Sequence, residues 1–255
     1  MLRSLVGSEM CIRDSQYTDG FQYYDLQVDD KQLTKLNAED ALKNKAKIIE
    51  NNKVVNIEIF GDFWKTSLED GQIIKSKVLI NASAIGFYGS HPQTEFTEEN
   101  IQGDDFLANL CKEWESIAKN KPRATRLLIV RIGIVLAKDG GALGKMLPIF
   151  RAGLGGPIGD GKQWMSWIHR TDLCNLINES VKNSAWSGVV NGVAPNPVRM
   201  NEFSNSLGQV LGRPSLFAVP GPILKLILGD GARVVLEGQN VKPQRLNKLL
   251  SLIHI

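Results

Sequence analysis

Two features are nearly absent from the 255-residue sequence, and each absence excludes a class of protein. The three cysteines, Cys11, Cys111 and Cys174, form no Cys-x-x-Cys pair and no metal-ligand spacing. Cysteines that are so few, and odd in number, argue against a disulfide framework. They predict buried free thiols in a reducing compartment. No apolar stretch approaches the ~20 residues of a membrane-spanning helix, because Lys225 and Asp230 interrupt the longest ones. We therefore expect no membrane partner.

A concentrated positive charge is also missing. The formal net charge is +3, and the basic residues are scattered rather than gathered in a stripe with aromatic residues between them. Nucleic acid is therefore not an expected partner. The chain has 43% hydrophobic and 22% charged residues, which is typical of a folded protein and argues against disorder. Its length suits one large domain or two small ones.

The two ends of the chain differ from the rest in composition. A secretory signal peptide needs a basic start and an apolar core of about 7–15 residues, but the apolar run after Arg3 stops at Val6. Residues 1–15, with the string VGSEMCIRDS, and residues 251–255, SLIHI, resemble translated sequencing-adapter DNA. We expect both to be artefacts of a trimmed environmental reading frame without tertiary contacts; a frayed tail is the alternative.

The composition changes near residue 76. Residues 16–75 are polar and are not assigned to a domain; a helix is predicted over 29–47 and a strand over 53–60. Beyond them, runs typical of strands alternate with segments of helical spacing, which predicts a parallel α/β sheet over 76–198. The expected strands lie at 78–83, 127–136, 164–168 and 188–193, and the expected helices at 104–119, 141–153, 171–181 and 200–211. Residues 199–250 are expected to form a small helical lobe on the substrate side.

The local sequence indicates where two of these helices begin and how one strand is buried. Asp104 or Asp105 is the expected N-cap of the first helix, and Thr171 or Asp172 that of the third. The run LLIVRIGIVL at 127–136 is apolar on both faces, as a buried parallel strand is.

Several long strings in this region resemble one family. They are SAIGFYG at 83–89, GDDFLANLCKEWE at 103–115, RIGIVLAKDGGALGKMLPIF at 131–150, GLGGPIGDGKQWMSWIHRTDL at 153–173, NGVAPNPV at 191–198 and LEGQNVKPQRL at 236–246. The family is the atypical, epimerase-like branch of the short-chain dehydrogenase superfamily, with a small C-terminal domain of unknown function. The resemblance covers about residues 76–248 and is greatest to cyanobacterial and plastid members. It implies a Rossmann-like parallel sheet that binds NADP or NAD.

The glycine-rich fingerprint that cradles the dinucleotide pyrophosphate at a helix N-terminus is not found upstream of residue 78. The N-terminal fingerprint unit is therefore expected to be missing or replaced, and binding of the cofactor to be weak. The one glycine-rich string, GLGGPIGDG at 153–161, follows a predicted helix and precedes a strand, which is the wrong context. It is interpreted as a substrate-side loop or as a plain turn.

The superfamily's Tyr-x-x-x-Lys pair, which supplies acid–base catalysis, is also missing. None of the four tyrosines has a lysine four residues later; Tyr88 has Pro92 there. The resemblance to extended members places Ala84 where their catalytic Ser or Thr lies, with Ser83 one residue earlier. Ser83 and Tyr88 are therefore the predicted catalytic residues. The alternatives are a plain strand-end serine and a tyrosine that packs on the sheet.

Five residues at two predicted strand ends are expected to contact the nicotinamide: Ala82, Ser83, Arg131, Ile132 and Gly133. Glycine at position 133 would give the backbone room to approach a ring. Arg131 could instead pair with a carboxylate, although Glu113 and Glu115 are expected to lie on a solvated helix face.

The predicted substrate-binding residues are Gln163, Trp164 and Ser166. Sugar-nucleotide epimerases carry a diphosphate-binding arginine where this chain has Met165, which argues against a sugar-nucleotide substrate. Trp164 could also be a core residue, and His169 is expected to support the start of the next helix. No cluster of Cys, His and Asp indicates a metal.

Two functions remain open at this point. The first is an NAD(P)-dependent epimerase or oxidoreductase of an unknown small molecule, in a bacterial cytoplasm or the plastid stroma. The second is a nucleotide- or partner-binding protein that retains the fold without the chemistry. Distinctive residues at strand ends and loops favour the first, and the missing Tyr/Lys pair favours the second.

Overall fold

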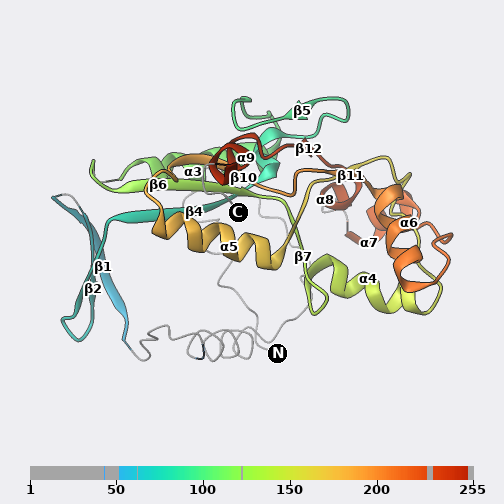
Figure 1. The fold of residues 1–255 in the computed structure, drawn as a ribbon, viewed down its shortest axis with the longest axis horizontal. Helices are drawn as coiled ribbons and strands as arrows, with labels where there is room; N and C mark the ends of the chain where they lie inside the picture. The colour runs from blue at the N-terminus through green and yellow to red at the C-terminus, as the bar shows by residue number, and fades with distance from the viewer. Residues whose placement is uncertain (1–42, 44–51, 62, 122, 229–231, 252–255) are drawn as a thin grey trace.

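The computed structural model describes residue 43 and residues 52–61, 63–121, 123–228 and 232–251 (Figure 1). The predictions for residues 1–15, for most of the helix over 29–47 and for residues 252–255 lie outside the described residues.

A parallel sheet of three strands forms the centre of the molecule. Its order is β10–β6–β4, and both neighbouring pairs are parallel. The strands are β4 (Val78–Ala84), β6 (Arg126–Ile132) and β10 (Gly188–Gly192). This arrangement confirms the predicted α/β class with a Rossmann-like parallel sheet.

Alternating side chains of these strands build two separate cores, one on each face of the sheet. Leu127 and Ile129 pack with Ala118 of α3 (Phe106–Lys119). Leu128 and Val130 pack on the opposite face with Leu176 of α5 (Arg170–Lys182) and with Leu246 of α9 (Gln244–Ser251). Helices therefore cover both faces of β6, which explains its unbroken apolar sequence.

The helix starts are partly as predicted. Asp105 is the N-cap of α3, and its carboxylate accepts a hydrogen bond from the N–H of Ala108 at 2.8 Å. The prediction of Thr171 or Asp172 as the N-cap of α5 was wrong. His169 has that position, and its Nδ1 accepts from the N–H of Thr171 at 3.2 Å. The expected support of this helix by His169 is thereby confirmed.

Two runs predicted as single strands are each divided. LLIVRIGIVL forms β6 and β7 (Ile134–Leu136), and WMSWI forms β8 (Trp164–Met165) and β9 (Trp167–His169). β7 pairs with β9, and β8 pairs with β11 (Val198–Arg199), in two separate small sheets. The break lies where Gly133 passes Ser166: a Cβ on Gly133 would stand 2.4 Å from the Ser166 carbonyl oxygen.

The described part of the N-terminal segment is a small antiparallel sheet, β1–β2–β3, separate from the central one. Its strands are β1 (Val54–Phe60), β2 (Phe63–Leu68) and β3 (Ile73–Ser76). The strand predicted over 53–60 is thus confirmed.

The last part of the chain returns to the carboxyl ends of the central strands. After α4 (Gly141–Arg151) and α6 (Met200–Leu211) come α7 (Gly221–Leu228) and α8 (Arg233–Leu236). β12 (Asn240–Val241) then pairs in parallel with β5 (Glu95–Phe96), and α9 packs beside β10. Among the described residues, no helix is both long and apolar enough to cross a membrane.

Candidate functional site

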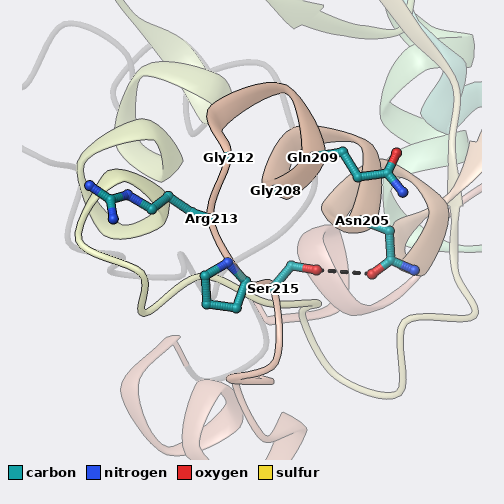
Figure 2. Close-up of a pocket in the computed structure, with 7 residues that line it drawn as sticks. Asn205, Gly208, Gln209, Gly212, Arg213 and Ser215 are labelled. Carbon is teal, nitrogen blue, oxygen red and sulfur yellow. Dashed lines mark hydrogen bonds between the residues drawn. The ribbon is translucent and has the colours of Figure 1, made fainter.

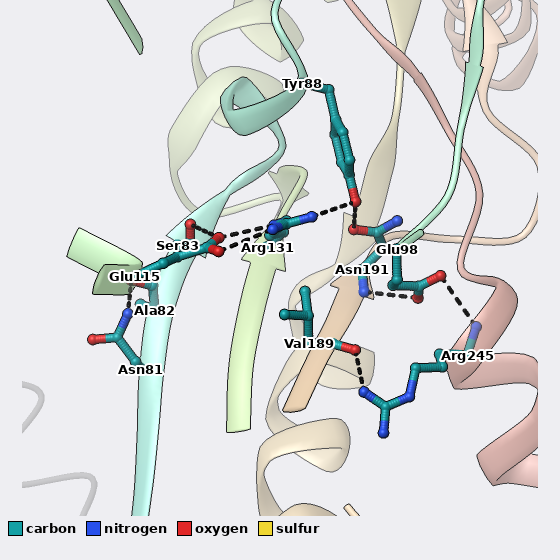
Figure 3. Close-up of polar contacts among 10 residues, drawn as sticks. All are labelled: Asn81, Ala82, Ser83, Tyr88, Glu98, Glu115, Arg131, Val189, Asn191 and Arg245. Carbon is teal, nitrogen blue, oxygen red and sulfur yellow. Dashed lines mark hydrogen bonds and ion pairs between the residues drawn. The ribbon is translucent and has the colours of Figure 1, made fainter. Parts of the chain in front are cut away.

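A row of three polar side chains lies at the carboxyl ends of the central strands (Figure 3). Ser83 of β4 and Asn191 of β10 both stand opposite Arg131 of β6 in the strand register. Opposite residues of neighbouring strands share a face of the sheet, so all three side chains lie on the face that α3 covers. Each is at most 5% exposed.

Arg131 is held by a carboxylate from α3. Its Nε donates to Glu115 Oε1 at 2.8 Å and its Nη2 to Glu115 Oε2 at 2.9 Å, and the two residues are 4% and 1% exposed. The expectation of a solvated Glu115 was wrong, and the alternative of a carboxylate partner for Arg131 is confirmed. Bidentate pairing satisfies both charges, which a buried ion pair requires.

Tyr88 closes the 3₁₀ turn η1 (Ile85–Tyr88) that follows β4. Its hydroxyl donates to Asn191 Oδ1 at 2.7 Å and accepts from Arg131 Nη1 at 3.0 Å, and the residue is 1% exposed. The ring stacks on Phe96 at 5.1 Å between centroids. Burial raises the pKa of the Tyr88 phenol, and the charge and hydrogen bond of Arg131 oppose this rise without cancelling it.

Ser83 completes the group. Its hydroxyl donates to Glu115 Oε1 at 2.9 Å. Three of the predicted site residues, Ser83, Tyr88 and Arg131, therefore belong to one connected network, as Figure 3 shows. Their catalytic and cofactor-binding roles stay predictions.

The other predicted cofactor residues lie at the same strand ends. Ala82 is exposed on β4, and Ile132 and Gly133 are half-buried. The expected reason for glycine at position 133 was wrong, because the space beside it is already filled. A Cβ there would stand 2.4 Å from the Ser166 carbonyl oxygen and 2.6 Å from Val193 Cγ1. Glycine is needed at this position for the close approach of two chain segments.

The predicted substrate residues lie apart from this network and hold other segments. Gln163 donates to the carbonyls of Ile158 and Val235 at 2.9 and 3.0 Å. The indole N–H of Trp164 donates to the carbonyl of Pro92 at 3.0 Å, and the Arg199 guanidinium lies 3.8 Å from the Trp164 ring.

Ser166, the third of these, is buried against the C-terminal segment. Its hydroxyl donates to the carbonyl of Gln239 at 2.6 Å and accepts from the N–H of Val241 at 2.9 Å. We call residues 238–245 the strap, because they run from Ser166 to the outer edge of β10. No described contact joins Gln163, Trp164 or Ser166 to Ser83 or Tyr88, and their substrate contacts stay predictions.

The strap also covers the free edge of β10. Arg245 Nη1 donates to the carbonyl of Val189 at 2.7 Å and Nη2 to that of Ser187 at 2.5 Å. Glu98 Oε1 accepts from the N–H of Asn191 at 3.0 Å, and Glu98 Oε2 from the N–H of Arg245 at 3.2 Å (Figure 3). Side chains thus take the place of a further strand.

Sequence reasoning missed Asn191, Glu98, Glu115 and the strap. Asn191 had a usable signal, since a polar residue inside the apolar run GVVNGV is the kind that is buried only with partners.

A hollow lies at the end of α6, away from this network (Figure 2). It measures about 370 Å³ and is lined by Asn205, Gly208, Gln209, Gly212, Arg213, Pro214 and Ser215. None of the predicted site residues lines it.

The described residues fit neither a whole dinucleotide nor a metal ion. They contain no strand followed by a glycine-rich turn and a helix N-terminus, which is the element that holds the pyrophosphate. No described group of three or more His, Cys, Asp or Glu side chains could hold a metal ion.

The chain is similar to a plant protein over most of the region that carries this site. Epimerase family protein SDR39U1 homolog, chloroplastic, of Arabidopsis thaliana is 51% identical over 172 residues, which are 68% of this chain and 50% of that protein. The chain belongs to the epimerase-like family of atypical short-chain dehydrogenases. It spans about half the length of this relative.

The chain is also similar to other members of the epimerase-like family. Epimerase family protein YfhF of Bacillus subtilis is 36% identical over 173 residues, covering 67% of this chain and 57% of that protein. The crystal structure of human epimerase family protein SDR39U1 (isoform 2) with NADPH has a TM-score of 0.65 and 37% identity, over 68% of this chain and 59% of that chain. Residues 219–249, which include α7 and the strap, match the family described as Domain of unknown function (DUF1731).

Proposed function

We propose that this chain is the substrate-side part of an NAD(P)-dependent epimerase or oxidoreductase that acts on a small molecule. The supporting observation is the polar row at the carboxyl ends of three parallel strands, which is where open α/β sheets bind ligands. The human family member named above was crystallised with NADPH, which favours NADP over NAD as the cofactor of the whole protein. The relatives of this chain in Bacillus subtilis and in the Arabidopsis chloroplast favour the bacterial cytoplasm or the plastid stroma as its location.

Within this proposal, Ser83 and Tyr88 are the residues that act on the reacting oxygen. A tyrosine that donates a proton must reach the substrate. The Tyr88 hydroxyl is buried and already bound to Asn191 and Arg131. Proton transfer by Tyr88 therefore requires that a substrate oxygen replace Asn191 as the acceptor.

A second function is favoured by the same contacts. The side chains of Ser83, Tyr88 and Arg131 all bind to other parts of the protein. A network so fully satisfied is what a binding protein without catalytic activity would retain to hold its strand ends in place.

The test is the binding of NADPH, measured by calorimetry. We expect this chain by itself to bind with a dissociation constant of about 1 mM or weaker, which corresponds to a binding free energy of at most about 4 kcal/mol. Fusion to the N-terminal half of the Arabidopsis relative, with residues 1–75 removed, should tighten binding at least 100-fold. Micromolar binding by the chain alone, or no gain in a folded fusion protein, would contradict the proposal.

A further inference from the structure

Asn191 connects the C-terminal segment to Tyr88. It is 0% exposed, and its side-chain amide makes two hydrogen bonds. Its Nδ2 donates to the carbonyl of Lys242 at 3.0 Å, and its Oδ1 accepts from the Tyr88 hydroxyl at 2.7 Å. Its backbone N–H is bound separately, by Glu98, so β10 remains anchored whatever the side chain does.

The chemistry of these groups fixes the direction of each hydrogen bond. A backbone carbonyl can only accept, so the NH₂ end of the Asn191 amide must face Lys242. The oxygen end then faces Tyr88, and the phenol has to donate its proton to it. Arg131 has donors only, so it bonds to a lone pair of the same phenol oxygen. The orientation of the Tyr88 proton therefore follows from the position of the Lys242 carbonyl.

The strap holds this carbonyl firmly. The N–H of Lys242 donates to the carbonyl of Phe96 at 2.8 Å, beside the β5–β12 pairing. Val241 is 0% exposed and belongs to the same apolar cluster as Tyr88, Phe96 and Val193. Ser166 fixes the strap on one side of Lys242 and Arg245 fixes it on the other. Movement of the Lys242 carbonyl would disrupt all of these contacts.

We propose that Asn191 is a positioning residue, set by the strap, that holds the Tyr88 proton as a hydrogen-bond donor at the strand ends. This role rests on the proposed function, in which Tyr88 handles a proton. The proposal also gives the C-terminal segment a role in the site. The strap orients the Asn191 amide, and this amide in turn orients the Tyr88 hydroxyl. A substrate oxygen would then meet a tyrosine whose proton already points toward β10.

Asn191 favours the neutral phenol, because an amide oxygen can accept a hydrogen bond from the phenol but not from the phenolate. The charged or titratable groups around Tyr88 are Arg131 on β6, Glu115 and Cys111 on α3, and Glu98 in the loop after β5. Substitution of Asn191 leaves all four in place, so a change in the Tyr88 pKa reports on the amide.

The experiment measures the pKa of the Tyr88 phenol in the full chain, without cofactor or substrate. Tyr17, Tyr23 and Tyr24 are replaced by Phe, and Tyr88 is labelled with 3,5-difluorotyrosine, whose pKa is lower than that of tyrosine. Fluorine NMR then follows its ionisation while the protein is folded. Asn191→Leu removes the acceptor and should raise the ionisation constant about 10-fold, the equivalent of one hydrogen bond. Asn191→Asp keeps an acceptor and adds a negative charge, so it should lower the constant.

Val193→Ala is the matched control. It removes packing from the same cluster but no hydrogen bond to Tyr88, and it should leave the ionisation constant within about 2-fold. The proposal is overturned if Asn191→Leu and Val193→Ala shift the constant equally, or if Asn191→Asp leaves it unchanged. The opposite signs for Leu and Asp support it, and the Asp variant alone decides if the Leu variant does not fold. Since no cofactor is present, the result is independent of whether the fusion protein binds NADPH.

Discussion

Arg131 is the residue on which the site is built. It has two bonds to Glu115, one to the Tyr88 hydroxyl, and its guanidinium lies 3.3 Å from the centroid of the Phe87 ring. A buried guanidinium needs all of these partners, because each unsatisfied donor in a dry interior carries a desolvation cost. The site is therefore sensitive to the loss of either charge.

Glu115→Leu tests this sensitivity. It leaves Arg131 charged and buried without its carboxylate, so we expect the free energy of unfolding to fall by about 3–5 kcal/mol. Urea denaturation measures the change. Glu113→Leu, at an exposed position of the same helix, is the control and should change stability by about 0.5 kcal/mol or less. Similar effects of the two substitutions would show that the Arg131–Glu115 pair contributes little.

Tyr88→Phe tests whether Tyr88 is the proton donor. It removes both bonds of the hydroxyl, and we expect a loss of about 1–3 kcal/mol in stability. If Tyr88 is the proton donor of the whole protein, the substitution should also lower its turnover by about 10²-fold or more. Ser83→Ala should cost less activity, and Lys112→Ala, at an exposed helix position, almost none. Full activity with reduced stability would show that Tyr88 is a structural residue and not the proton donor.

At the scale of elements, the sequence predicted the helix α3 correctly but not which of its faces is buried. The helical spacing of large apolar residues predicted the element, yet Phe106, Trp114 and Ile117 are 54%, 43% and 70% exposed. The buried face carries Ala108, Cys111, Glu115 and Ala118. Small side chains let the helix approach the sheet. The ion pair with Arg131, which is distant in the sequence, offsets the cost of burying Glu115. Neither reason can be detected in the helix sequence alone.

The covering of β10 is the second feature at this scale. An unpaired strand edge is a template for association with another chain. Arg245 occupies the edge carbonyls of Val189 and Ser187, and Glu98 occupies the edge N–H of Asn191. The described residues thus protect this edge by side chains rather than by a strand.

Arg245→Met should expose that edge while preserving most of the apolar stem. We expect the free energy of unfolding to fall by about 1–3 kcal/mol, because the carbonyls of Val189 and Ser187 lose a charged donor. We also expect concentration-dependent association, measured by analytical ultracentrifugation. Lys248→Met, on the exposed side of the same helix, is the comparison. A monomer of unchanged stability would show that water replaces the guanidinium without cost.

At the scale of the whole molecule, the sequence predicted the parallel α/β sheet because alternation of strands and helices is a local pattern. It did not predict the closure of the site by the C-terminal segment. The bonds that make this closure join residues 51 positions apart, as in Asn191–Lys242, and 147 apart, as in Glu98–Arg245. Local periodicity contains no information on such pairs. Likewise, the division of LLIVRIGIVL at Gly133 depends on Ser166, which comes close only in the folded chain.

Tyr88 also couples the stability of the whole molecule to pH. Its pKa in the folded protein is raised by burial above about 10, the ordinary value for tyrosine. A raised pKa means that the folded state holds the proton more tightly than the unfolded chain does.

The stability that the protonated Tyr88 phenol contributes is fully present below about pH 10. It is lost as the pH rises through the folded pKa, with a slope approaching about 1.4 kcal/mol per pH unit. The quantity to measure is the difference in unfolding free energy between wild type and Tyr88→Phe, because contributions common to both proteins cancel in it. That difference should be constant from about pH 7 to 9.5 and should shrink above about pH 10. A difference that stays constant at high pH would mean that the Tyr88 phenol ionises as easily in the folded protein as in the unfolded chain.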